Sequence, residues 1–137
     1  MFHPFRFATR SLVLSAALVA GVAAAHHSTA MFWWGKEIAM PNATVERWEW
    51  TNPHTFLYVV APAGHGVERW AFEGMSPNHL ARTGWSRHTL KPGDKIKLTY
   101  YPLKDGRKGG FNVTVTLPDG RTLRQLTSPT ESPATGS

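Results

Sequence analysis

The sequence contains no cysteine among its 137 residues. Without cysteine the folded protein has no disulfide bond, so the packing of its side chains must supply its stability. A lipid-modified amino terminus, which requires a cysteine directly after a leader, is excluded. A cysteine nucleophile is excluded for the same reason.

A hydrophobic run long enough to cross a membrane is also missing near the amino terminus. The apolar stretch Leu12–Ala25 has 14 residues, whereas a membrane-spanning helix needs about 20. It follows a segment that carries Arg6 and Arg10 and no acidic residue, and it ends in Ala23-x-Ala25. This order is typical of a secretory signal peptide that is cleaved after Ala25. We therefore expect a leader over residues 1–25, export, and no membrane span after cleavage.

Acidic residues are scarce. Nine Asp and Glu stand against 15 Lys and Arg, which gives a net charge of +6. Loss of Arg6 and Arg10 with the leader leaves 13 basic residues and a net charge of about +4. This charge is modest for a nucleic-acid partner, and the periplasm offers little nucleic acid to bind. The basic loop Lys104, Arg107 and Lys108 could instead meet anionic sugars, lipid headgroups or an acidic protein.

Catalytic signatures are missing as well. The sequence has no G-x-S-x-G, no H-E-x-x-H and no phosphate-binding loop. The carboxylates on expected strands are Glu46, Glu49, Glu68 and Glu73, and their spacing marks no catalytic pair. We interpret them as solvated or as partners of Arg47 and Arg69, and we lean towards a protein that is not an enzyme.

Short apolar segments with β-sheet alternation are present throughout the mature chain. Before residue 76 the expected strands are Ala43–Trp50, Thr55–Ala61 and Val67–Glu73, and the alternation in the first slips by one at Glu46-Arg47, as at a β-bulge. A later strand has Ile96, Leu98 and Tyr100 inward and Lys95, Lys97 and Thr99 outward. Phe111, Val113, Val115 and Leu117 are expected on one face of the next strand. A turn at Pro118–Gly120 then leads to a short last strand, Arg121–Leu126. The expected core includes Trp70, Phe72, Ile96, Leu98, Val113 and Val115.

One helix is expected between the third and fourth strands. Ser76 suits its N-cap, Pro77 its first position and Gly84 the residue past its end. This order of elements predicts a mainly β domain over residues 26–126, a small OB-fold-like Greek-key barrel. Another small barrel, or an open sheet closed by one helix, is the alternative. The Ser/Thr/Pro-rich residues 127–137 are expected to form a disordered tail.

Two adjacent histidines, His26 and His27, directly follow the expected cleavage site. Cleavage after Ala25 would place an α-amine and two imidazoles within one chelate's reach, and nitrogen donors of this kind favour Cu(II) among common divalent ions. Cleavage after Ala24 would put a histidine third, which is also a good chelate. Alternatively, the pair is a polar start of the mature chain without a role of its own.

Other candidate binding residues lie in the loops and on the tryptophan-bearing strands. OB-type barrels bind ligands over one face, between the first–second and fourth–fifth strand loops. The first of these loops presents Asn52 and His54 beside Pro53, although His54 could equally be an ordinary surface residue. Trp48, Trp50 and Trp70 could line a ligand surface. His79 and His88 are expected to be solvated.

Several longer segments resemble a family of small exported proteins of Gram-negative bacteria whose function is unknown. The matching segments are AHHS, EWTNPH, WAFEGMSPNHLARTGW, LKPGDKI and LPDGRTL, which together extend over roughly Ala25 to Leu126. The resemblance implies a periplasmic location and a similar architecture, but no activity. The family's recurring polar positions correspond here to His26, His27, Ser28, Asn52, Pro53, His54, Glu73, Ser76, Pro77, Asn78 and Trp85.

Two positions depart from that pattern. Thr29 stands where the family usually has an aromatic residue, and Trp33 stands where an aspartate usually follows the phenylalanine. The second difference removes a carboxylate that could have completed a metal site near His26.

The leading hypothesis is a non-enzymatic periplasmic protein that binds copper through His26, His27 and His54. The alternative is a metal-free module that binds a protein or glycan through its tryptophans and basic loop. A copper oxidase of the N-terminal-histidine type is a third hypothesis, for which no substrate surface can be recognised in the sequence.

Overall fold

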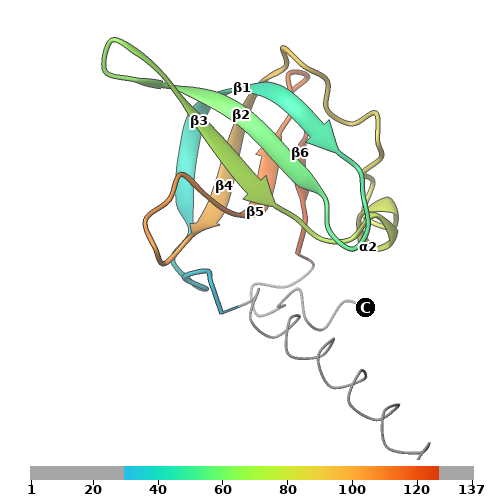
Figure 1. Ribbon diagram of the computed structural model, residues 1–137. Helices are drawn as coiled ribbons and strands as arrows, with labels where there is room; N and C mark the ends of the chain where they lie inside the picture. Colours follow the sequence, from blue (N-terminus) through green and yellow to red (C-terminus); the bar gives the residue numbers. More distant parts are fainter. Residues whose placement is uncertain (1–29, 127–137) are drawn as a thin grey trace, which may run out of the picture.

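The computed structural model describes residues 30–126. The expected leader, the His26-His27 pair and the expected tail over residues 127–137 lie outside the described residues. The elements, in order, are β1 (Ile38–Glu49), β2 (Phe56–Ala63), β3 (Gly66–Glu73), α2 (Pro77–Ala81), β4 (Lys95–Pro102), β5 (Gly109–Thr116) and β6 (Thr122–Arg124) (Figure 1).

The strands form a closed barrel. Their order is β3-β2-β1-β4-β5-β6, and a parallel pairing of β3 with β5 joins the two ends of the five-stranded part. The short strand β6 extends the sheet beyond β5, and α2 lies between β3 and β4 in the chain. The predicted OB-fold-like barrel with one helix after the third strand is therefore confirmed, and the open-sheet alternative is wrong.

Two glycines make the closure of the barrel sterically feasible. Gly109 and Gly110 belong to β5 and lie opposite Ala71 and Phe72 of β3. A Cβ atom on Gly109 would lie 2.2 Å from the carbonyl oxygen of Ala71, and one on Gly110 would lie 2.1 Å from that of Tyr101. No side chain fits at these distances. The two glycines that follow the basic loop therefore begin strand β5, and only glycine can occupy these two positions.

Strand β1 begins earlier than its alternation predicts. It starts at Ile38 rather than Ala43, and its register with β4 shifts between Met40 and Ala43. The shift coincides with Pro41, which has no N–H to donate to the ladder. A second shift between Val45 and Arg47 confirms the bulge predicted from the sequence.

The core fills the barrel mainly as the sequence predicts. Phe72, Ile96, Leu98, Val113 and Val115 are all buried. Trp70 is only half-buried, which corrects the expectation that it belongs to the core, because it lines a surface cleft together with Pro41 and Pro62.

Phe111 is buried on a different face from the one expected. It pairs with Tyr101, whereas Val115 pairs with the core residue Leu98, and the register of β5 shifts between these pairs. Cross-strand partners share a face of the sheet, so the bulge moves Phe111 to the side of Tyr101. There the rings of Phe32 and Trp34 contact Phe111 at centroid distances of 5.8 and 5.3 Å. We call these four residues, Phe32, Trp34, Tyr101 and Phe111, the outer aromatic cluster.

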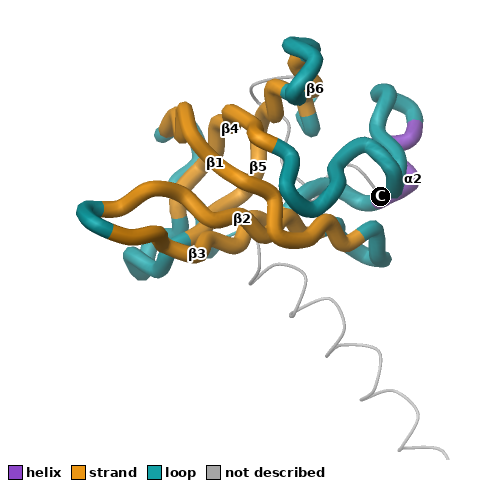
Figure 2. The backbone as a smooth tube through the Cα atoms, turned by 90° about the horizontal axis from the view of Figure 1, so that it is seen from above, coloured by secondary structure: helices purple, strands orange, loops and turns teal. Residues whose placement is uncertain are grey.

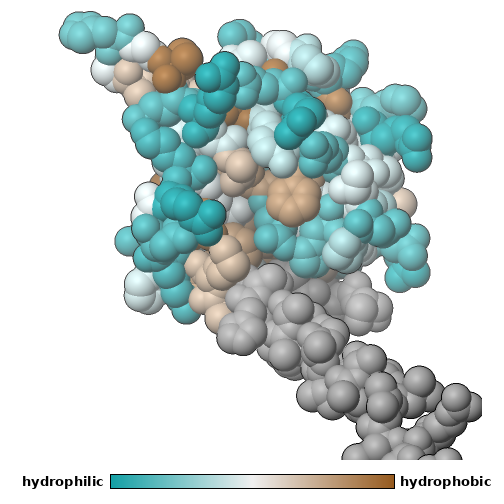
Figure 3. Space-filling view, in the orientation of Figure 1, coloured by the Kyte–Doolittle hydropathy of each residue, from teal (hydrophilic) through white to brown (hydrophobic). Residues whose placement is uncertain are grey.

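Within residues 30–126, two parts of the chain protrude from the barrel. Figure 2 shows the β2–β3 hairpin extending to one side of the barrel, with α2 and its neighbouring loops on the opposite side. The face seen in Figure 3 is largely hydrophilic, and its apolar side chains are scattered rather than gathered into one patch. None of the helices within residues 30–126 is long and apolar enough to cross a membrane.

Candidate functional site

A histidine–carboxylate pair lies where the β1–β2 loop meets the end of β3. His54 lies just before β2 and Glu73 is the last residue of β3, and the pairing of Phe56 with Glu73 brings them together. Nδ1 of His54 contacts Oε1 of Glu73. Both side chains are mostly buried, with 25% and 18% of their surface exposed, so water screens the contact only partly.

The backbone on either side of the pair is fixed by hydrogen bonds. Thr55 N–H donates to Met75 O at 3.2 Å, and Gly74 N–H donates to Thr55 O at 2.9 Å. The Oγ1 hydroxyl of Thr55, which is fully buried, donates to the same Met75 carbonyl at 2.9 Å. These bonds hold the residues next to His54 and next to Glu73 against each other, so the geometry of the pair follows from the fold.

The carboxyl end of the described chain supports the same region. Oε1 of the buried Gln125 accepts a hydrogen bond from Met75 N–H at 2.7 Å. Nε2 of His79, in α2, lies 2.9 Å from the Gln125 carbonyl oxygen. The expectation that His79 is solvated is therefore wrong, because the end of the barrel packs against the helix.

The helix α2 starts as predicted. Ser76 has extended backbone angles, and its hydroxyl accepts a hydrogen bond from the His79 N–H at 3.3 Å, with Pro77 in the first turn. Gly84 has a φ of 90°, which suits the residue past the helix end. Leu80 is fully buried and attaches the helix to the core.

The histidine–carboxylate pair has a defined chemical capacity. A carboxylate that accepts a hydrogen bond from Nδ1–H selects the tautomer in which Nε2 carries a free lone pair. This is the arrangement that orients and strengthens histidine as a metal ligand. Within residues 30–126 no group of three or more His, Cys, Asp or Glu is positioned to hold a metal ion. The pair can therefore offer one imidazole ligand to a metal ion.

The three candidate tryptophans do not lie in one cluster. Trp48 and Trp50 contact each other with ring centroids 5.8 Å apart, and Trp48 also contacts Trp85 at 5.8 Å. Trp48 Nε1 donates to the Ser86 carbonyl at 3.1 Å, which ties this group to the loop after α2. Trp70 instead stacks on Phe72 and contacts Tyr100.

The basic loop between β4 and β5 is largely engaged with its own surroundings. Lys104 Nζ lies 5.4 Å from the centre of the exposed Trp33 ring. Arg107 Nε binds Asp105 at 2.7 Å, and Lys108 contacts Glu68 on β3. The adjacent Arg107 also keeps the pKa of the exposed Asp105 carboxyl below its ordinary value, through hydrogen bonds from its backbone and side chain. Asn52 is exposed in the β1–β2 loop, next to the cis peptide bond to Pro53.

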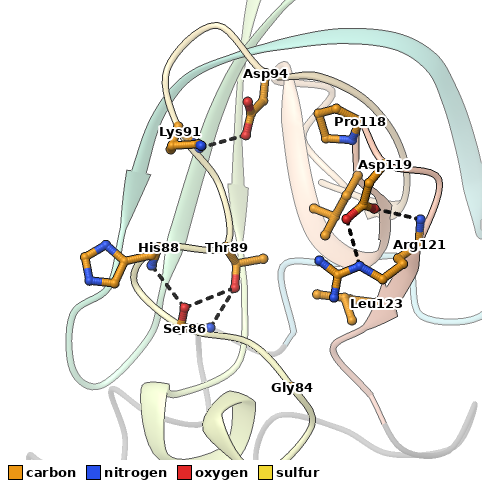
Figure 4. A pocket seen from close by; sticks show the side chains of 11 residues that line it. Gly84, Ser86, His88, Thr89, Lys91, Asp94, Pro118, Asp119, Arg121 and Leu123 are labelled. Carbon is orange, nitrogen blue, oxygen red and sulfur yellow. Dashed lines mark hydrogen bonds and ion pairs between the residues drawn. The ribbon is translucent and has the colours of Figure 1, made fainter.

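A polar cleft of about 460 Å³ lies between the loop after α2 and the β5–β6 turn (Figure 4). Asp94 Oδ2 accepts a hydrogen bond from the Lys91 N–H at 2.9 Å, and Asp119 binds Arg121 through both backbone and guanidinium N–H groups. These hydrogen bonds lower the pKa of the Asp119 carboxyl. His88 lies on the wall of this cleft and is exposed, as expected. The two acids balance Lys91 and Arg121, so the cleft has no strong preference for an anion or a cation.

Sequence reasoning singled out His54 without its partner. Glu73 was interpreted as solvated or arginine-bound, and Thr55 and Gln125 were not recognised at all. The family pattern gave the available signal, since Glu73 is among the recurring polar positions it implies. Gln125 carries no such signal, because its contact with Met75 spans 50 residues.

Comparison with known proteins gives a family and no function. No curated protein and no solved structure matches the chain. Residues 13–112, which include β1 to β4, the histidine–carboxylate pair and α2, match the model of a family of unknown function, DUF6152. This chain therefore belongs to the family of unknown function DUF6152.

Proposed function

We propose that the protein is exported to the periplasm, is not an enzyme, and binds Cu(II) through its processed amino terminus together with His54. His26 would supply its amine and imidazole, His27 a second imidazole, and His54 a further nitrogen from the folded domain. The observation that carries the proposal is the contact between His54 Nδ1 and the Glu73 carboxylate. With Nδ1 bound in this way, the lone pair of Nε2 is available to a metal ion.

The location of Phe32, near the start of the described residues, supports a site that includes both the amino terminus and His54. Phe32 forms a bridge to Leu103 and contacts the ring of Phe111 at 5.8 Å. Phe111 is in turn the strand partner of Glu73 in the parallel β3–β5 pair. His27 precedes Phe32 by five residues, and an extended chain of that length reaches about 16–18 Å. This reach of the chain from Phe32 is compatible with a site that joins His27 to the His54–Glu73 pair, and it supports the proposal.

The donor set favours copper over the other common ions. Neutral imidazole and amine nitrogens give divalent first-row metals affinities that peak at Cu(II), and no thiolate is available to favour zinc.

The test measures Cu(II) affinity by competition titration on protein purified from periplasm with its natural amino terminus. We expect one Cu(II) per chain with nitrogen-dominated spectra, and sharply weaker binding in His27→Ala and His54→Ala. Glu73→Gln keeps the shape of the side chain but loses the charge that orients the imidazole, and should weaken binding about 10–100-fold. His65→Ala, an exposed histidine at the tip of the β2–β3 hairpin, is the matched control and should change nothing.

Two outcomes would contradict the proposal. One is a synthetic peptide of residues His26–Phe32 that binds Cu(II) as tightly as the whole protein, because the fold would then contribute nothing. The other is an intact mass of the exported protein that still includes Met1–Ala25, because the free amine would not exist. The Cu(II) affinity should also depend on pH, because protons compete with the metal for the same nitrogen lone pairs. It should decrease as the pH drops below the ordinary pKa values of imidazole and of an α-amine, about 6.5 and 7.7–8.0.

A further inference from the structure

A second cleft lies at the end of the barrel where β4 begins and β5 ends. Its volume is about 560 Å³, within the range of small-molecule sites. Its apolar lining consists of Pro41, Pro62, Pro118, Ala43, Ile96 and Leu117. The three proline rings are exposed, and we call this site the proline cleft. It lies apart from the histidine–carboxylate pair, with which it shares no residue.

The charges at the proline cleft have one sign. Lys95 and Lys97 both line it, and no Asp or Glu is among its lining residues. Lys95 Nζ donates to the Thr44 hydroxyl at 2.7 Å, which holds the ammonium at the rim. Within residues 30–126, no ion pair or hydrogen bond engages the side chain of Lys97. Two unneutralised ammonium groups therefore lie beside an apolar wall.

The nearest carboxylates in the sequence do not neutralise these lysines. Asp94 precedes Lys95, and Asp119 lies between two residues of the lining. Figure 4 shows both acids on the wall of the neighbouring polar cleft, where Asp94 accepts a hydrogen bond from the Lys91 N–H and Asp119 binds Arg121. The polar cleft thus has balanced charges, whereas the proline cleft has only positive ones. A ligand of the proline cleft should therefore be negatively charged.

A smaller cleft adjoins the proline cleft and continues it towards Trp70. The two share Pro41, Asn42 and Pro62, and the smaller one, of about 220 Å³, is also lined by Trp70 and Tyr100. Glu68 lines the smaller cleft as well, and its carboxylate contacts Lys108. The half-buried position of Trp70 is explained by this second cleft. An elongated apolar group could therefore continue from the lysines past the prolines towards Trp70.

We propose that the proline cleft binds a small amphipathic carboxylate, such as a medium-chain fatty acid. The carboxylate lies between Lys95 and Lys97, and the alkyl chain packs on the proline rings. The charge pairing supplies orientation, and burial of the alkyl chain supplies most of the affinity. This inference does not depend on the copper proposal.

The test compares octanoate with octanamide, which has the same alkyl chain and no charge, and with acetate, which has the charge and no chain. Binding to the whole mature protein is followed by calorimetry and by amide chemical shifts. We expect saturable one-to-one binding of octanoate, with shifts centred on Thr44, Ile96 and Thr116. Octanamide should bind several-fold more weakly, and acetate, which lacks the chain that supplies most of the affinity, should show no saturable binding at the same concentrations. Added salt should weaken the binding of octanoate and leave that of octanamide unchanged.

Variants distinguish binding in the proline cleft from non-specific hydrophobic binding elsewhere on the surface. Lys97→Gln should weaken octanoate binding about fivefold, the effect of losing one exposed charge contact, and leave octanamide unchanged. Lys104→Gln, which removes a lysine outside the cleft, is the matched control and should bind like the unaltered protein. Equal affinity for octanoate and octanamide, shifts centred elsewhere, or no saturable binding would each overturn the proposal.

Discussion

At the scale of single residues, the histidine–carboxylate pair depends on what lies behind it. Gly74 follows Glu73 directly and has no room for a side chain. A Cβ atom there would lie 2.3 Å from Gln125 Oε1 and 2.6 Å from Thr55 Oγ1. Both of these side chains are fully buried, so neither can swing aside into solvent. The absence of a single methyl group thus allows the hydrogen bonds that fix the pair.

Gly74→Ala should destabilise the protein by about 1–3 kcal/mol, the usual cost of overpacking a dense core. It should also move the amide resonances of Thr55 and Met75, whose hydrogen bonds it crowds. Urea unfolding gives the first quantity and NMR the second. Gly66→Ala is the control, because a Cβ atom there meets nothing within 4 Å, and we expect a change of no more than about 0.5 kcal/mol. Equal stability of the two variants would contradict the crowding argument.

At the scale of elements, the short helix α2 connects the site to the barrel. Its N-cap is Ser76, its buried anchor is Leu80, and its His79 ring reaches the Gln125 carbonyl. After the helix, Trp85 Nε1 donates to the Arg124 carbonyl at 2.9 Å. A five-residue helix has little stability of its own, so these contacts and its cap hold it in place.

Ser76→Ala should cost about 1 kcal/mol of stability, because the N–H of His79 loses its acceptor. Ser76→Asp should recover most of that loss, since a carboxylate accepts the same hydrogen bond at a helix start. Thermal unfolding measures both changes, and hydrogen exchange of the helix amides localises them. If the aspartate variant is no more stable than the alanine variant, the cap does not stabilise this helix.

At the scale of the whole molecule, the barrel buries adjacent tyrosines on its two faces. Tyr100 lies against Phe72 inside, and Tyr101 lies under Trp34 in the outer aromatic cluster. Burial raises the pKa of Tyr100 above 10.0. Burial is also the main cause of the raised pKa of Tyr101, with the negative charge of Glu37 adding to it and Arg124 opposing it.

These shifts predict a loss of stability in alkaline solution. A folded-state pKa above the unfolded value means that the folded protein holds the phenol proton more tightly. Its contribution is therefore fully present below about pH 10 and is lost as the pH rises through the folded pKa. The free energy of unfolding should fall less steeply above pH 10 in a Tyr100→Phe, Tyr101→Phe variant than in the unaltered protein, as followed by urea unfolding. Identical slopes would show that the two phenols do not titrate differently on unfolding.

The sequence by itself determined the elements whose signals are local. Alternation at Ile96, Leu98 and Tyr100 defines β4, the slip at Glu46-Arg47 marks a bulge, and Ser76 with Pro77 starts the helix. These signals depend on side-chain periodicity and on capping chemistry within a few residues, so they can be recognised without the partner strands. The order of the elements then restricted the topology to a few small folds, of which the OB-like barrel is the observed one.

Only the tertiary structure decided the contacts that cross between strands. His54 and Glu73 are 19 residues apart, and the register of β2 against β3 brings them together. The start of β1 is concealed in the sequence because Pro41 interrupts its alternation. Gly109 and Gly110 close the barrel, but in the sequence they look like part of the preceding loop. A strand position that requires glycine adds nothing to the alternation of apolar and polar side chains by which strands are recognised. Local patterns reflect the conformation of a segment, whereas a site made of distant residues depends on strand register, which is set by the packing of the whole barrel.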